Sequence, residues 1–184
     1  ITQNTLRITG TFWALDTNLA YRRHFPSVNW IKSYSLYLDS LQEWYIREIG
    51  PDWKELRDRI MYLLQKEVEL QEIVQLVGPD ALPESEKAIL EVTRMIREDF
   101  LQQSAYSDTD SYCALDKQYW MLKTIHRYDS GNTNAIGKGV SLKQVGALPL
   151  RAEIARMREL GSIEEIRALG DRIEAQLSAL EVEQ

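Results

Sequence analysis

The sequence predicts a mainly α-helical protein, preceded by a short segment of strand and helix. From residue 34 onward, apolar residues recur at three- and four-residue spacing, which is the period of one helix face. The pairs Gly50-Pro51 and Gly78-Pro79 interrupt that pattern, as expected where one helix ends and the next begins. Before residue 34, a short alternating pattern is typical of a strand. Helices therefore dominate the predicted fold.

Composition excludes several classes of protein. Hydrophobic residues make up 44% and charged residues 27%, which is typical of a soluble globular domain. The net charge of −6 disfavours binding to nucleic acid or to an anionic membrane. No apolar run is long enough to span a bilayer. Cys113, His24 and His126 are the only cysteine and histidines, so we expect no zinc site and no internal disulfide.

The first element that we expect is a strand over residues 5–15, where apolar residues alternate before a bulky run. Asp16 or Thr17 can then cap a short helix, which ends before Pro26. A single strand needs partners, and no later segment reads clearly as a strand. We therefore expect its partner strands to lie upstream, in a longer protein of which this chain is a piece.

Four helices follow in the prediction. Their apolar positions form continuous stripes, and Asp52 is expected to cap the second, whose stripe includes Ile73 and Val77. The expected helices cover residues 34–49, 53–77 and 83–103, and the fourth begins at residue 116.

Residues 129–139 concentrate Gly, Asn and Ser, a composition that predicts a loop or a frayed helix end. Gly137-Lys138, with Gly131 upstream, superficially suggests a phosphate loop. A phosphate loop has four residues between its first Gly and its Gly-Lys pair, and a Ser or Thr follows the Lys. Here five residues intervene and Gly139 follows, so we predict an ordinary surface loop.

Two capping boxes predict the last helices. Ser141 with Gln144 opens a short helix, a further helix covers residues 151–160, and Ser162 with Glu165 opens the final one. The apolar stripe of that final helix could pack in the core of the domain or against a partner helix.

The residues alone provide no catalytic motif. The many carboxylates, among them Glu67, Glu98 and Asp99, lie in patterns expected of solvated helix faces. Neither His24 nor His126 belongs to a recognisable nucleophilic arrangement. We therefore predict no catalytic residue in this chain.

Several blocks carry a family resemblance, strongly over about the first 125 residues. They include Phe12-Trp13-Ala14-Leu15-Asp16, Arg22-Arg23-His24-Phe25-Pro26, residues 70–80, Phe100-Leu101-Gln102-Gln103 and Asp110-Ser111-Tyr112-Cys113. Together they resemble the catalytic A subunit of archaeal and vacuolar-type ATP synthases and ATPases.

The resemblance implies an architecture and an activity. Residues 1–37 would end the nucleotide-binding domain, and residues 38–184 would form the C-terminal helical domain. The full-length subunit would bind ATP or ADP with Mg²⁺ and couple ATP synthesis or hydrolysis to proton or sodium transport. Its phosphate loop and catalytic glutamate would lie upstream, so the isolated chain is expected to be inactive.

The resemblance also implies partners. The subunit would alternate with a non-catalytic B subunit in a hexamer, contact a central-stalk rotor, and belong to a peripheral complex at the cytoplasmic face of the membrane. Contact with the membrane would be indirect. Non-catalytic subunits carry Ser-Arg where this chain has Ser33-Tyr34, which favours the catalytic subunit.

An adenine pocket is implied for Phe25, Tyr106 and Tyr112, by similarity to the aromatic residues that stack on the base in F-type catalytic subunits. The residues alone leave open that all three rings are core or partly buried aromatics, because large rings usually lie in such places.

A rotor contact is implied for the turn that carries Asp80, Glu84 and Glu86. From the residues alone, it is a solvated turn stiffened by two prolines. A helical protein-interaction module unrelated to ATP is the alternative function that the composition permits.

Overall fold

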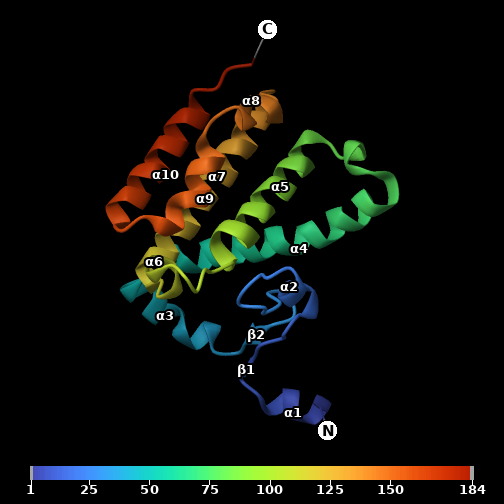
Figure 1. The fold of residues 1–184 in the computed structure, drawn as a ribbon, viewed down its shortest axis with the longest axis vertical. Helices are drawn as coiled ribbons and strands as arrows, with labels where there is room; N and C mark the ends of the chain where they lie inside the picture. Colours follow the sequence, from blue (N-terminus) through green and yellow to red (C-terminus); the bar gives the residue numbers. More distant parts are fainter. Residues whose placement is uncertain (1, 183–184) are drawn as a thin grey trace.

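The computed structural model describes residues 2–182 and confirms a mainly α-helical fold. A bundle of helices forms the body, and a small N-terminal segment lies beneath it (Figure 1). No helix among the described residues is long and apolar enough to cross a membrane. The longer bundle helices are α3 (Leu38–Glu48), α4 (Trp53–Val77), α5 (Glu84–Met95), α7 (Leu115–Gly137) and α10 (Ile163–Ser178).

The N-terminal segment differs from its prediction. The expected strand over residues 5–15 is wrong: the chain forms α1 (Thr2–Ile8) and then only the two-residue strand β1 (Thr11–Phe12). β1 pairs antiparallel with β2 (Tyr34–Ser35), which also removes the first residues from the helix predicted over 34–49. An unpaired strand leaves its backbone groups unsatisfied, whereas a helix pairs them internally.

Asp16 caps the next helix as predicted. Its Oδ1 accepts hydrogen bonds from the amides of Asn18 and Leu19, which begin α2 (Thr17–Tyr21). Its Oδ2 accepts a third from Asn29, at 2.8 Å. The hydrogen bond from Asn29, together with those from the backbone, lowers the pKa of Asp16. The cap therefore ties α2 to the segment that returns toward β2.

The long helix α4 is confirmed, although its apolar stripe is buried only in part. The helix is buried as far as Leu70, through Leu56, Ile60, Leu63, Leu64 and Leu70. Ile73 and Val77, which the sequence places on the same inward stripe, are exposed. The end of α4 extends to the edge of the bundle, where the short turn η1 (Pro79–Ala81) leads into α5 (Figure 1).

Asp52 does not make the predicted cap at the start of α4. Its carboxylate instead accepts a hydrogen bond from the Tyr119 hydroxyl and pairs with Lys123 Nζ at 2.9 Å. Burial raises the pKa of Asp52, but these two donors outweigh it and hold the pKa below its usual value. The side chain thus joins the start of α4 to α7 and accepts no hydrogen bond from the first amides of its own helix.

The centre of the core lies between α5, α7 and α10, whose buried residues include Val92, Ile125, Tyr128, Ile166 and Ile173. Both predicted capping boxes are present, at Ser141 with Gln144 and at Ser162 with Glu165. They open α8 (Leu142–Gly146) and α10, and between these lie α9 (Leu150–Arg156) and the single turn η3 (Met157–Glu159).

The loop predicted over residues 129–139 is wrong. α7 continues through Gly137, and the chain turns only at Gly139, whose φ of 96° suits glycine. Asn132 and Ala135 are buried, and a Cβ on Gly131 would lie 2.6 Å from Leu177 Cδ1 of α10. Close packing against α10 therefore sustains a helix that local composition disfavours.

Candidate functional site

The Phe25 turn, defined here as residues 24–26, is anchored beneath the bundle. His24 is buried, its Nε2 donates to the carbonyl oxygen of Arg97 at 2.9 Å, and its ring lies beside Trp30. Because a carbonyl can only accept, this bond fixes the proton of a neutral His24 on Nε2. This hydrogen bond holds the backbone of the following residue, Phe25, close to Arg97, just after the end of α5.

A second segment, residues 102–112, passes alongside that turn. It follows the π-helical turn η2 (Ile96–Leu101), which ends the helix predicted over residues 83–103. Asp110, in α6 (Asp108–Ser111), is buried, and its Oδ2 accepts from the Ser104 amide at 2.6 Å. Gln103 donates its side-chain amide to the Asp110 carbonyl at 3.2 Å. Internal hydrogen bonds therefore shape this segment.

One backbone hydrogen bond joins the two segments. The Gln103 amide donates to the Phe25 carbonyl oxygen at 2.7 Å. Residues that are far apart in the sequence are thereby brought together, as the predicted grouping of Phe25 with Tyr106 and Tyr112 requires.

The three predicted aromatic residues all lie at the surface. Phe25 is 54% exposed, Tyr112 is 87% exposed and Tyr106 is fully exposed. None of the three contacts another of them ring to ring within residues 2–182. None of the three rings lies in the core, although Phe25 is partly buried. The structure places the rings on adjoining segments without stacking them together.

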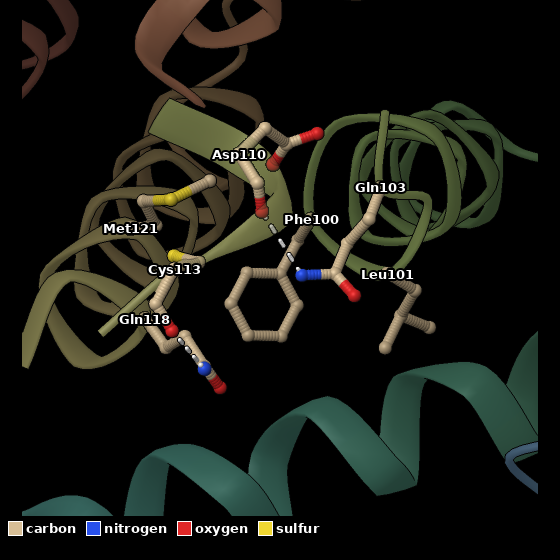
Figure 2. Close-up of a pocket in the computed structure, with 7 residues that line it drawn as sticks. All are labelled: Phe100, Leu101, Gln103, Asp110, Cys113, Gln118 and Met121. Atoms are coloured by element: carbon tan, nitrogen blue, oxygen red, sulfur yellow. Dashed lines mark hydrogen bonds between the residues drawn. The ribbon is translucent and has the colours of Figure 1, made fainter. Parts of the chain in front are cut away.

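A cavity of about 180 Å³ lies behind the second segment. Figure 2 shows the Phe100 ring in its middle, with Gln118 and Met121 on one side and Gln103 on the other. Its lining combines apolar surface with two side-chain amides, and the full set is Phe100, Leu101, Gln103, Asp110, Cys113, Gln118 and Met121. Gln118 Nε2 donates to the Cys113 carbonyl at 2.8 Å.

Sequence reasoning did not assign Phe100, Gln103 and Gln118 to the site, although the block Phe100–Gln103 marked the region. Such a lining suits a flat ring with polar edges, because apolar faces and amide groups meet in it. Burial raises the pKa of the Cys113 thiol, so the cysteine is not a preformed thiolate. No group of three or more acidic, His or Cys side chains within the described residues could hold a metal ion.

The predicted acidic turn lies at the edge of the bundle, between α4 and α5 (Figure 1). Asp80 is exposed within η1 and Glu86 is half-buried. Glu84 accepts a hydrogen bond from the Leu142 amide at 3.2 Å, which links the turn to the start of α8. Leu76, 83% exposed, and Val77, also exposed, lie in the last turn of α4, just before these acidic residues in the chain. The turn is therefore both acidic and apolar.

Comparison with known proteins identifies the family. Residues 42–145 match the family described as the C-terminal domain of V and A type ATP synthase. The chain belongs to this family. The resemblance seen in the sequence is thus confirmed. The match to the V and A type family also disfavours the alternative of a helical interaction module unrelated to ATP.

The sequence matches to relatives of this V and A type family member extend over all or nearly all of the chain. The chain is 60% identical over 183 residues to an A subunit, numbered 2, of the A-type ATP synthase of Methanospirillum hungatei, covering 100% of this chain and 31% of that protein. It is 54% identical to the A subunit of the A-type ATP synthase of Methanopyrus kandleri, with 98% and 31% covered. The chain therefore spans about a third of the length of these curated relatives.

A solved ATP synthase protein, NeqB of Nanoarcheaum equitans, shares the fold. Its TM-score is 0.55 at 21% identity, covering 68% of this chain and 29% of that one. This similarity supports the helical architecture of the V and A type domain and nothing finer.

Proposed function

We propose that this chain is the C-terminal part of the catalytic subunit of a rotary ATP synthase or ATPase, and that it supplies the adenine side of the nucleotide site. The observation that carries the proposal is the hydrogen bond from Gln103 to Phe25. It joins two segments that present exposed rings, at Phe25, Tyr106 and Tyr112.

Adenine is flat and has apolar faces, so aromatic rings can bind it by stacking. Base–aromatic stacking is worth about 1–3 kcal/mol per base in nucleic-acid complexes. Exposed rings cost the folded domain little and become buried when a base enters between them.

The phosphate chemistry lies outside this chain in the proposal. The segment from Gly131 to Gly137 is helical and packs on α10, so it does not form a phosphate-binding loop. Residues upstream in the full-length subunit would bind the phosphates of ATP or ADP and the Mg²⁺ ion. We expect the isolated chain to lack ATPase activity for that reason.

The proposed partners follow from the same assignment. The full-length protein would alternate with non-catalytic B subunits in a hexamer, on the cytoplasmic face of the membrane. Tyr34 pairs with β1 at the position where non-catalytic subunits carry an arginine. An arginine of the neighbouring B subunit would therefore complete the catalytic site, as arginine fingers do in related enzymes.

Photolabelling of the full-length complex with 2-azido-ATP tests the adenine assignment. The azido group on the base reacts with side chains that touch it, so label is expected on peptides that contain Phe25, Tyr106 or Tyr112. Excess ATP should suppress the labelling. Label confined to peptides outside residues 24–26 and 100–118 would contradict the proposal.

The acidic turn is proposed to contact the central rotor. Support comes from its place at the end of the α4–α5 hairpin, where Asp80 and Leu76 are exposed. A partner that inserts apolar side chains flanked by basic ones would match this mixed surface. The hairpin would then transmit rotation as a lever.

Replacing Asp80, Glu84 and Glu86 together by alanine in the full complex should lower coupling between ATP hydrolysis and ion transport. Because Glu84 also binds the Leu142 amide, the pair Asp80→Ala and Glu86→Ala separates rotor contact from loosening of the turn. Glu164→Ala, an exposed position in the first turn of α10, is the control. Unchanged torque and coupling in both variants would exclude a charge-based contact.

A further inference from the structure

Arg158 reaches the base of the ring-bearing segment from a distant part of the sequence. It lies in the turn η3, after α9, and its side chain is largely buried. Nη1 donates to the Gln102 carbonyl at 3.0 Å and Nη2 donates to the Glu98 carbonyl at 2.6 Å. One planar guanidinium thus binds the last turn of η2 and the first residue after it.

These carbonyls lie at the end of a helix, where the backbone acceptors have no partner in the following turn. A cation near the carboxyl end of a helix is also electrostatically favourable. The guanidinium therefore holds the point at which η2 ends and the segment of residues 102–112 departs.

The same guanidinium faces the far end of that segment. Its Nη1 lies 3.7 Å from Asp110 Oδ2, and its Nη2 lies 3.9 Å from Asp99 Oδ1. Asp110 is the carboxylate that accepts from the Ser104 amide. Arg158 therefore touches the start of the segment directly and its end through Asp110, with Tyr106 between them.

The backbone carbonyl of Arg158 and the side chain of Glu159 also connect η3 to the segment of residues 102–112. Lys117 Nζ donates to the Arg158 carbonyl at 2.6 Å and to the Thr109 carbonyl at 3.1 Å. The Ser107 hydroxyl donates to Glu159 Oε2 at 3.0 Å. The turn η3 thus fixes the segment at several points, although nothing in the local sequence of η3 suggests it.

We propose that Arg158 is a positioning residue for adenine binding: it sets the path of residues 102–112 and so the placement of Tyr106 and Tyr112. The inference rests on the proposed function, because it assumes that these rings contact the base. Arg158 itself lies behind the segment and is not assigned a contact with nucleotide.

The test uses the full-length protein in its complex, with ATP hydrolysis measured over a range of ATP concentrations. Arg158→Gln should raise the KM for ATP by about tenfold, as loss of a charged hydrogen bond does. It should leave kcat nearly unchanged, because a remote contact with the base acts on substrate and transition state alike. Arg156→Gln, an exposed arginine two residues earlier, should leave both constants unchanged.

A double-mutant cycle with Tyr112→Ala separates positioning from general destabilisation. If Arg158 acts through the ring, Arg158→Gln should change KM little once Tyr112 is alanine. A merely structural role would lower the melting temperature without this non-additivity. Two outcomes would overturn the inference and leave the proposed function standing. In the first, the changes in KM caused by the two substitutions multiply in the double variant. In the second, Tyr112→Ala raises KM but Arg158→Gln does not.

Failure of Tyr112→Ala and Phe25→Ala to affect KM would overturn both the inference and the adenine assignment. If the Arg158→Gln variant does not assemble into the complex, Arg158→Lys is tested in its place. Lysine keeps the charge but lacks the planar fork that reaches both carbonyls. Amide hydrogen exchange at residues 103–107 should then be faster in Arg158→Lys than in Arg156→Lys, and equal rates would count against the proposal.

Discussion

Replacing Gly131 with valine is expected to lower the free energy of unfolding by about 1–3 kcal/mol, the usual cost of overpacking a core. A Cβ at this position would lie 2.6 Å from Leu177 Cδ1 and 3.0 Å from Leu177 Cβ. Leu177 is buried in α10, and its Cβ is fixed by the helix backbone. The two helices must therefore separate to admit the new side chain.

Urea denaturation of the 184-residue chain measures this effect. Gly137→Val is the matched control, because Gly137 lies in the same helix and a Cβ there would meet nothing within 4 Å. The control should unfold within about 0.5 kcal/mol of the unsubstituted chain, as surface substitutions usually do. Equal destabilisation by the two valines would show that α7 and α10 do not pack closely at Gly131.

Elements with strong local signals were predictable. α10 combines a capping box at Ser162 and Glu165 with an apolar stripe, and both appear in the structure. α4 lies between Gly-Pro pairs, and its apolar stripe is buried as far as Leu70. In these elements the local preference and the tertiary packing agree, so the sequence pattern alone is sufficient.

Elements that depend on distant contacts were not predictable. Residues 129–137 are helical because Gly131 packs closely against Leu177 of α10 and Asn132 is buried, which composition does not reveal. The strand expected over residues 5–15 was wrong because only Thr11 and Phe12 pair in a continuous ladder, with residues 34–35.

The candidate site likewise depends on contacts that local sequence patterns do not reveal. The family resemblance indicated Phe25, Tyr106 and Tyr112, but no local pattern did. The contacts that bring their segments together join residues far apart in the chain, such as Gln103 with Phe25 and Arg158 with Gln102. Periodicity and capping signals report only on neighbours within about one helical turn, so these contacts leave no trace in them.

Phe25→Ala combined with Tyr112→Ala is expected to produce the largest functional change. Each ring should contribute about 1–3 kcal/mol of stacking to nucleotide affinity. Because both are largely exposed without nucleotide, their loss should cost the domain little stability. The two losses should raise the KM for ATP and affect kcat less, since stacking acts equally on bound substrate and transition state.

The affinity of the full-length protein for ATP, measured with and without these two substitutions, tests most directly whether this chain supplies the adenine side of the site. Tyr62→Ala is the control, because it removes an exposed ring from the middle of α4. We expect at least about tenfold weaker binding in the double variant and unchanged binding in the control. Affinity that survives in the double variant would contradict the adenine assignment.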